Sequence, residues 1–101
     1  MPKIIYTESY NRRAAVFLKK HPDLVSQYSK TLQLLELNPA HPSLKLHRLK
    51  GKHSELYSVA INLTYRISLY FILEKDTVIP AYIGSHDEVY RSGAPVMPEA
   101  D

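Results

Sequence analysis

The sequence contains no cysteine, only three glycines and no long apolar run among its 101 residues. The lack of cysteine excludes disulfides, thiol nucleophiles and cysteine-ligated zinc sites, and it is typical of proteins from reducing compartments. The glycines, Gly51, Gly84 and Gly93, lie too far apart to form a glycine-rich phosphate loop. No apolar stretch is long enough to span a bilayer, and the N-terminal residues lack the apolar core of a signal peptide. We therefore expect a soluble, cytoplasmic protein with no membrane partner.

Length and composition predict a single domain with a small hydrophobic core. Hydrophobic residues make up 45% of the chain and charged residues 23%, which are ordinary values for a globular protein. We expect this domain to comprise residues 1–91. Residues 92–101 contain two prolines and show no periodic pattern, so we expect them to form a flexible C-terminal tail.

Positive charge is distributed unevenly along the chain. Residues 1–73 carry eleven Lys or Arg against four Asp or Glu, whereas residues 74–101 carry two against six. No acidic residue lies between Glu36 and Glu55, and that interval holds His41, Lys45, His47, Arg48, Lys50, Lys52 and His53. Such a block favours contact with a polyanion such as nucleic acid, although a solvated basic loop explains the spacing equally well.

Hydrophobic periodicity predicts two helices in the N-terminal part of the chain, after a short strand at residues 3–6. The first helix ends before Pro22, and the second begins there and ends near Pro39, because proline disfavours helical geometry in the residue before it. The break between the helices is short, which favours an antiparallel helix hairpin. Residues 39–53 fit neither helix nor strand, and we interpret them as a long loop.

Alternation of apolar and polar residues then predicts three antiparallel strands joined by two turns, at residues 56–63, 65–73 and 77–84. We expect the two helices to cover the apolar face, which on the third strand would comprise Ile79, Ala81 and Ile83. Pro80 cannot donate a ladder hydrogen bond and should therefore lie at an edge or a bulge. The opposite face would stay partly open beside the basic loop, and it would carry Ser58, Asn62, Arg66, Ser68 and Tyr70.

A capping-box pattern, Ser85 followed by Glu88, predicts a short helical turn after the last strand. The expected fold is therefore α+β. It would have two N-terminal helices packed on one face of a small antiparallel sheet and a short helical turn near the C-terminus.

The polar residues of this arrangement suit the cleavage of RNA by its own 2′-hydroxyl. That reaction needs a base for the hydroxyl, an acid for the 5′-oxygen and cations for the charge that builds on phosphorus, and histidine and arginine supply these functions. Residues of suitable type are His47, His86, Arg66, Lys50, Lys52 and, for stacking, Tyr90. Structural roles explain these residues as well; Arg66, for example, could instead form an ion pair with Glu74 or Asp76. The histidine spacing matches no metal-binding motif, so we expect neither metal nor cofactor.

Four segments, in this order, resemble toxins of the RelE/ParE superfamily and are most similar to its YafQ/RelE-like branch: NPAHPSLKLHRLKG at 38–51, LYSV at 56–59, YRI at 65–67 and IGSHDEVY at 83–90. The resemblance implies a RelE-like domain with a fold similar to that of microbial ribonucleases. It also implies the toxin of a bacterial or archaeal type II toxin–antitoxin system. Such a toxin enters the ribosome, cleaves translated mRNA and is neutralised by a cognate antitoxin protein.

By position, the resemblance implies that Arg66 stabilises the phosphate transition state and that His86 is the general acid. His47 is the candidate base, and Tyr90 would orient or stack the substrate. The RNA backbone would be held by the basic residues Lys45, Arg48, Lys50 and Lys52.

One residue departs from the family pattern. Many relatives place a cation where this chain has Ala60, so one charge is missing from the expected phosphate site. Two alternatives to a nuclease therefore stay open: a ParE-like inhibitor of DNA gyrase, and a catalytically weak member that binds only RNA or its antitoxin. The histidines beside the Leu-Lys-Gly segment argue against the gyrase inhibitor, because a protein without nuclease activity needs no titratable pair.

Overall fold

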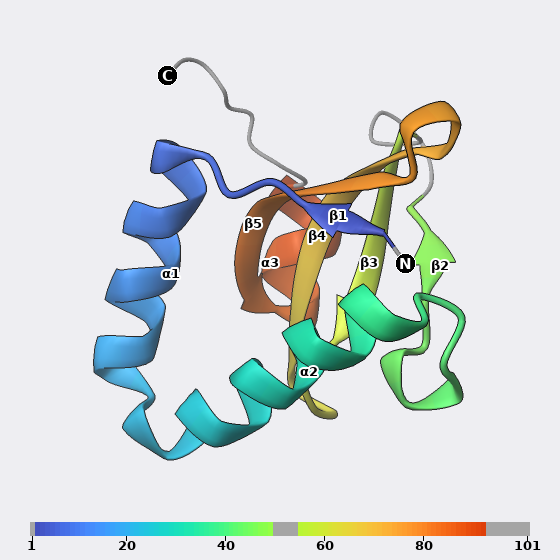
Figure 1. Ribbon diagram of the computed structural model, residues 1–101. Coiled ribbons are helices and arrows are strands. Elements are labelled where there is room, and N and C mark those ends of the chain that lie inside the picture. The colour runs from blue at the N-terminus through green and yellow to red at the C-terminus, as the bar shows by residue number, and fades with distance from the viewer. Residues whose placement is uncertain (1, 50–54, 93–101) are drawn as a thin grey trace.

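The computed structural model describes residues 2–49 and 55–92 (Figure 1). Of the tail expected at residues 92–101, Ser92 belongs to the last helix and residues 93–101 lie outside the described residues. The expected RNA-binding residues Lys50 and Lys52 also lie outside them. Within the described part of the chain, no helix is long and apolar enough to cross a membrane.

A five-stranded mixed sheet forms the centre of the protein (Figure 1), with strands in the order β1-β5-β4-β3-β2. Their bounds are Lys3–Ile4 for β1, Thr77–Ser85 for β5, Tyr65–Ile72 for β4, Leu56–Ala60 for β3 and His47–Arg48 for β2. The four strands from β5 to β2 are antiparallel to their neighbours, whereas β1 pairs with β5 in parallel. The α+β class is confirmed, but the expectation of a purely antiparallel sheet is wrong.

The two outer strands have two residues each, and of these the sequence predicted only β1, within the short strand expected at residues 3–6. β1 joins the sheet through Lys3 and Ile5, whose N–H groups donate to the carbonyls of Asp76 and Val78, each at 2.9 Å. β2 lies inside the segment that we interpreted as a loop, and it follows a single 3₁₀ turn at Pro42–Leu44. The long-loop interpretation is therefore wrong for these residues.

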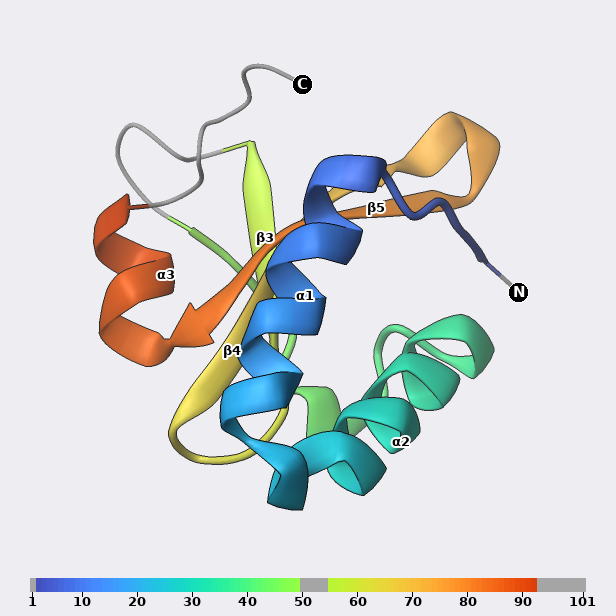
Figure 2. The ribbon, with the colours of Figure 1, turned by 90° about the vertical axis from the view of Figure 1, so that its left-hand side faces the viewer.

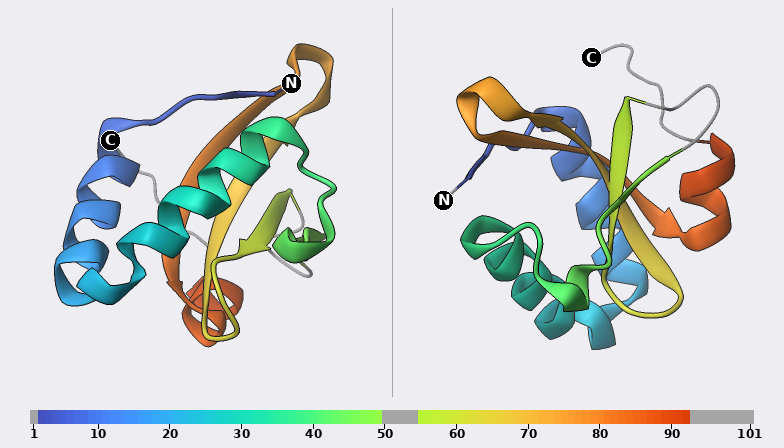
Figure 3. Two further views of the ribbon diagram at one scale, coloured as in Figure 1. Left: turned by 60° about the horizontal axis from the view of Figure 1, so that its bottom comes forward. Right: turned by 90° about the vertical axis from the view of Figure 1, so that its right-hand side faces the viewer.

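Two helices, α1 at Glu8–Lys20 and α2 at Val25–Leu37, cover one face of the sheet. Thr7 caps α1, because its hydroxyl oxygen accepts the Tyr10 N–H at 3.1 Å. The helices diverge from the 3₁₀ turn at Pro22–Leu24 instead of forming the expected antiparallel hairpin (Figures 1 and 3). The two helices therefore pack against different parts of the protein rather than along each other. α1 lies against β5, and α2 extends toward the 3₁₀ turn that precedes β2.

The main core lies between these helices and the sheet, and its fully buried members include Tyr10, Leu35, Val59, Ile67 and Leu69. A second apolar cluster lies on the opposite face. There α3, at His86–Ser92, buries Val89 against Leu49 and Leu56. The opposite face is therefore open only in part: Ser58, Arg66 and Ser68 are buried there, whereas Asn62 and Tyr70 are exposed.

A β-bulge in β5 changes which of its side chains reach the main core. Ser68 pairs with Tyr82 and the next residue, Leu69, pairs with Pro80, so one residue of β5 is left over. Pro80 lies at a bulge, as expected. Because the bulge reverses the alternation, Val78 joins Ile83 in the main core, whereas Ala81 packs in the second cluster. The assignment of Ile79 and Ala81 to the helix-covered face is wrong for this reason.

A buried tyrosine pair links α1 to α2 and predicts sensitivity to alkaline pH. The hydroxyls of Tyr10 and Tyr28 lie 2.8 Å apart, and Tyr10 is fully buried. Burial, followed by the neighbouring Tyr28, raises the pKa of Tyr10 well above its usual 10.0. As the pH rises through the pKa of the unfolded chain, the unfolded state therefore loses this proton first and becomes more stable.

We expect the free energy of unfolding to fall more steeply above about pH 10 in the wild type than in Tyr10→Phe, by up to about 1.4 kcal/mol per pH unit. Below that pH the variant should be less stable by about 1 kcal/mol, because it lacks the hydrogen bond to Tyr28. Urea unfolding followed by circular dichroism across this range measures both effects. Parallel pH curves for the two proteins would contradict the assignment.

Candidate functional site

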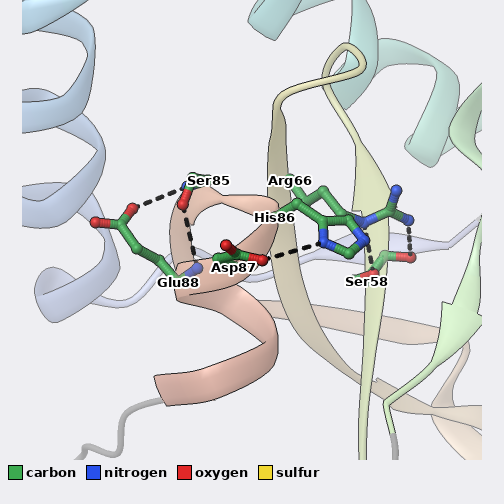
Figure 4. A network of polar contacts seen from close by, with 6 residues as sticks. All are labelled: Ser58, Arg66, Ser85, His86, Asp87 and Glu88. Atoms are coloured by element: carbon green, nitrogen blue, oxygen red, sulfur yellow. Dashed lines mark hydrogen bonds and ion pairs between the residues drawn. The ribbon is translucent and has the colours of Figure 1, made fainter.

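Arg66 lies in β4 with its side chain on the face covered by α3, and the residue is only 6% exposed. Its Nε donates to Ser58 Oγ at 2.9 Å, and its Nη2 donates to the Lys45 carbonyl at 2.8 Å (Figure 4 shows the contacts with Ser58). Desolvation lowers the pKa of Arg66 from its usual 12.5. Arginine is nevertheless charged at neutral pH, so the site contains a fixed, nearly buried cation.

The contacts of Arg66 join three parts of the chain. Ser58 belongs to β3, directly beside β4, and Lys45 lies in the connection between the Pro42–Leu44 turn and β2. Lys45 adopts a left-handed conformation, with φ 48°, which turns the chain there before β2 begins. Within residues 2–49 and 55–92, Arg66 Nη1 makes no hydrogen bond, whereas Nε and Nη2 do. Two nitrogens of the guanidinium thus hold it in place against Ser58 and the Lys45 carbonyl.

His47 lies beside this guanidinium, on β2. It pairs with Ser58, and its Nδ1 is 3.5 Å from Arg66 Nη2 and 3.1 Å from the Lys45 carbonyl. A carbonyl oxygen only accepts hydrogen bonds and a guanidinium only donates them, so the two contacts of Nδ1 fit opposite tautomers. The shorter contact, to the carbonyl, fits the tautomer with its proton on Nδ1, in which Nε2 is the nitrogen without a proton.

His86 begins α3 at the end of the β4–β5 hairpin. Its N–H donates to the carbonyl of Thr64 at 2.9 Å. Because Thr64 lies two residues before Arg66 in the chain, this hydrogen bond holds the start of α3 beside the start of β4. Its Nδ1 lies 4.0 Å from Asp87 Oδ1, and its side chain is 53% exposed (Figure 4). The imidazole is therefore accessible to a ligand and is carried on the face of the sheet that holds Arg66.

The start of α3 is held by the expected capping box. Ser85 N–H donates to Glu88 Oε1 at 2.9 Å, and Glu88 N–H donates to Ser85 Oγ at 3.1 Å. Gly84, which pairs with Arg66, is required by this arrangement. A Cβ at this position would lie 2.5 Å from Glu88 Oε1, so no larger residue fits without displacing the cap. The glycine thus allows α3 to begin close to the strand that carries Arg66.

The other expected site residues are not all gathered here. Arg48 alternates to the other face of the sheet, where its guanidinium lies 5.5 Å from the centre of the Tyr57 ring. The side chain of Tyr90 lies outside the described part of the structure, although its backbone belongs to α3. Ala60 pairs with Arg66 and borders a hollow of about 470 Å³, which is also lined by Lys45. Among the described residues, no group of three or more His, Asp or Glu side chains is placed to hold a metal ion.

Two parts of the site were not identified as functional from the sequence. Ser58 positions the guanidinium, and strand alternation had already placed it on the same face as Arg66. The Lys45 carbonyl left no sequence signal, because any residue supplies a carbonyl and only the left-handed turn directs this one toward the site.

Comparison with solved structures identifies proteins of the same fold. YafQ from E. coli strain BL21(DE3) has 14% sequence identity and a TM-score of 0.71, over 89% of this chain and 99% of YafQ. A metal-bound toxin from Helicobacter pylori has 21% identity and a TM-score of 0.69, over 88% of this chain and 99% of the toxin. A chain of the YoeB–YefM complex from Staphylococcus aureus has 18% identity and a TM-score of 0.64, over 85% and 98% of the two chains.

No family model and no curated protein sequence matches the chain. At identities this low, the likeness establishes a shared fold, which confirms the RelE-like architecture expected from the sequence. The roles of individual residues rest on the geometry of the site.

Proposed function

We propose that this protein, which shares its fold with YafQ and with a chain of the YoeB–YefM complex, is the toxin of a type II toxin–antitoxin system and cleaves mRNA on the ribosome. It would act in the bacterial or archaeal cytoplasm, where its substrate is translated. The observation that carries the proposal is the Arg66 guanidinium, nearly buried and fixed by Ser58 and Lys45, with the imidazole of His47 beside it.

In this mechanism the 2′-hydroxyl of the RNA gives its proton to His47 Nε2 and its oxygen attacks the adjacent phosphorus. The bond to the 5′-oxygen breaks, and protonated His86 gives that oxygen its proton. Nη1 of Arg66 donates to the phosphate oxygens as charge accumulates on them, and a cation fixed in advance stabilises the transition state without reorganising. The products are a 2′,3′-cyclic phosphate and a free 5′-hydroxyl.

RNA binding would extend beyond these three groups. The exposed side chain of Lys45 borders the hollow beside Ala60. Its ammonium group would compensate there for the cation that is missing at position 60. Lys50, Lys52 and Arg48 are proposed to hold the RNA backbone, and Tyr90 to stack on a base.

A cognate antitoxin is the proposed protein partner. One of the proteins with this fold forms a complex, that of YoeB with YefM. The chain has a formal net charge of +3, and its excess of cations lies in residues 1–73. An acidic, amphipathic segment that folds on contact would complement such a surface.

Expression without a partner tests the proposal. We expect induction of the wild-type gene in bacteria to stop growth and to produce cuts within translated messages, detected by primer extension. The same message with its start codon removed is the control and should remain intact, because cleavage requires the ribosome. Growth arrest with intact messages, together with loss of supercoiling by purified DNA gyrase, would contradict nuclease activity and favour the gyrase inhibitor.

A further inference from the structure

A second basic surface lies away from the site at Arg66, in a groove between α1 and the free edge of β5. β1 pairs with β5 only at Thr77 and Val78, so no described strand covers the rest of this edge. Figure 2 shows β5 ending between α1 and α3. The groove has a volume of about 480 Å³, within the range of sites that bind small molecules. We call it the α1–β5 groove; its lining includes Arg12, Arg13, Lys20, Tyr65, Tyr82 and Glu88.

The charge of the α1–β5 groove is predominantly positive. Arg12, Arg13 and Lys20 line it from a single helix, and no ion pair joins them to an acidic side chain among residues 2–49 and 55–92. Glu88 is the acidic residue of the lining, and its Oε1 already accepts the N–H of Ser85. The groove therefore offers several cations to an anionic ligand.

Aromatic rings form the floor of the same groove. Phe17, His21 and Tyr65 make a cluster, with ring centres 4.5 Å apart for Phe17 and His21 and 4.7 Å apart for His21 and Tyr65. On the other side, the Arg13 guanidinium lies 5.7 Å from the centre of the Tyr82 ring. Phe17 is buried, whereas His21, Tyr65 and Tyr82 are partly exposed. Partly exposed rings beside guanidinium groups are the combination that binds bases and phosphates of single-stranded nucleic acid.

We propose that the α1–β5 groove binds a nucleotide of a single-stranded RNA. Arg12 and Lys20 would contact its phosphates, and its base would stack against the exposed part of His21 or Tyr82. The proposal rests on the proposed function, because it assigns a second contact to the same class of substrate. An acidic protein segment would satisfy the cations but would not use the ring faces, so RNA fits the lining better.

The α1–β5 groove and the proposed cleavage site are lined by neighbouring residues of β4 and α3. Tyr65, in the groove, immediately precedes Arg66 on β4, and their side chains lie on opposite faces of the sheet. Glu88, at the groove wall, is in the first turn of α3 after His86. A strand of RNA that leaves His86 would therefore need only to pass the end of the β4–β5 hairpin to enter the groove.

The test uses a fluorescent ten-nucleotide RNA that carries 2′-O-methyl groups throughout, so that it binds without being cleaved. Its affinity for the purified full-length protein is measured by fluorescence anisotropy at several salt concentrations. We expect the double variant Arg12→Gln/Lys20→Gln to bind about five- to tenfold more weakly. The slope of log affinity against log salt should fall by about 1.4, because two phosphate contacts are lost.

Matched controls separate the groove from net charge. Lys19→Gln/Lys30→Gln removes the same charge from exposed residues that do not line the groove, and it should bind RNA almost as well as the wild type. Val16, which is 57% exposed and lines the groove, offers a second comparison. Val16→Glu should weaken binding and Val16→Gln should not, although both variants lose the same apolar side chain.

Equal affinities in the two double variants would overturn the inference. So would a selective loss of binding to a decaglutamate peptide with RNA affinity unchanged, which would assign the groove to an acidic protein segment. If the wild type cleaves mRNA in cells and the groove variants bind RNA normally, the groove assignment fails and the proposed function stands. If the wild type binds RNA through the groove but cleaves no message, the groove assignment stands and the nuclease fails.

Discussion

Replacing Arg66 with glutamine is expected to lower the rate of mRNA cleavage by about 10²–10³-fold, the usual cost of removing one pre-positioned group that stabilises a transition state. Glutamine keeps a polar side chain but has neither the charge nor the nitrogens that contact Ser58 and Lys45 and, in the proposed mechanism, the phosphate. Single-turnover cleavage on ribosomes stalled with a defined codon in the A site measures the effect.

The same substitution is expected to reduce stability, because the Lys45 carbonyl and the Ser58 hydroxyl lose their donor. An unsatisfied buried polar group costs about 1–3 kcal/mol, so rates must be compared at a temperature where circular dichroism shows both proteins folded. Ser58→Ala is the matched control: it frees Nε but keeps the charge, and it should lower the rate far less. A folded Arg66→Gln variant that cleaves at the wild-type rate would disprove the role.

Replacing His86 with alanine is expected to lower cleavage by about 10²–10⁴-fold, because a general acid contributes that much. The free energy of unfolding should change by no more than about 0.5 kcal/mol, since the side chain is 53% exposed and lies outside both apolar clusters. Single-turnover cleavage on ribosomes measures the rate, and urea unfolding followed by circular dichroism measures the stability.

Asp87→Asn is the control for His86→Ala, because it changes a neighbouring charge and leaves the imidazole in place. We expect it to cleave within about threefold of the wild type, as is usual for one exposed charge. A folded His86→Ala variant that cleaves at the wild-type rate would exclude His86 as the acid.

Much of the fold could be predicted because its main elements are encoded locally. The helices and the strands β3, β4 and β5 appear as runs of periodic residues, and the start of α3 as a capping box at Ser85 and Glu88. The two-residue strand β2 could not be predicted, and the short strand expected at residues 3–6 gave no sign of its parallel pairing, since the partners of both strands lie elsewhere in the chain. The bulge opposite Ser68 and Leu69 was also invisible, so alternation placed Ile79 and Ala81 on the wrong face.

The candidate site could be predicted in part, because some of its residues lie on strands whose alternation is visible in the sequence. Alternation along β3 and β4 places Ser58 and Arg66 on one face, and the β4–β5 turn brings His86 back toward Arg66. The burial of Arg66 could not be predicted, because it depends on α3 and on the chain at Lys45, both of which lie far from β4 in the predicted pattern. The α1–β5 groove was missed because its cations and rings come from α1, β4 and β5 together, and no single segment has the pattern.

The guanidinium of Arg66 also has a mechanical role, since it fastens the residues before β2 to the rest of the sheet through Lys45. A loss-of-function substitution at Arg66 therefore loosens an edge of the protein as well as removing a charge, and such variants should be cleared faster by cellular proteases. Substitutions at His86 leave the hydrogen bonds of Arg66 to Lys45 and Ser58 in place. Crystallographers who need an inert but intact form for complexes with RNA or an antitoxin should therefore begin at His86.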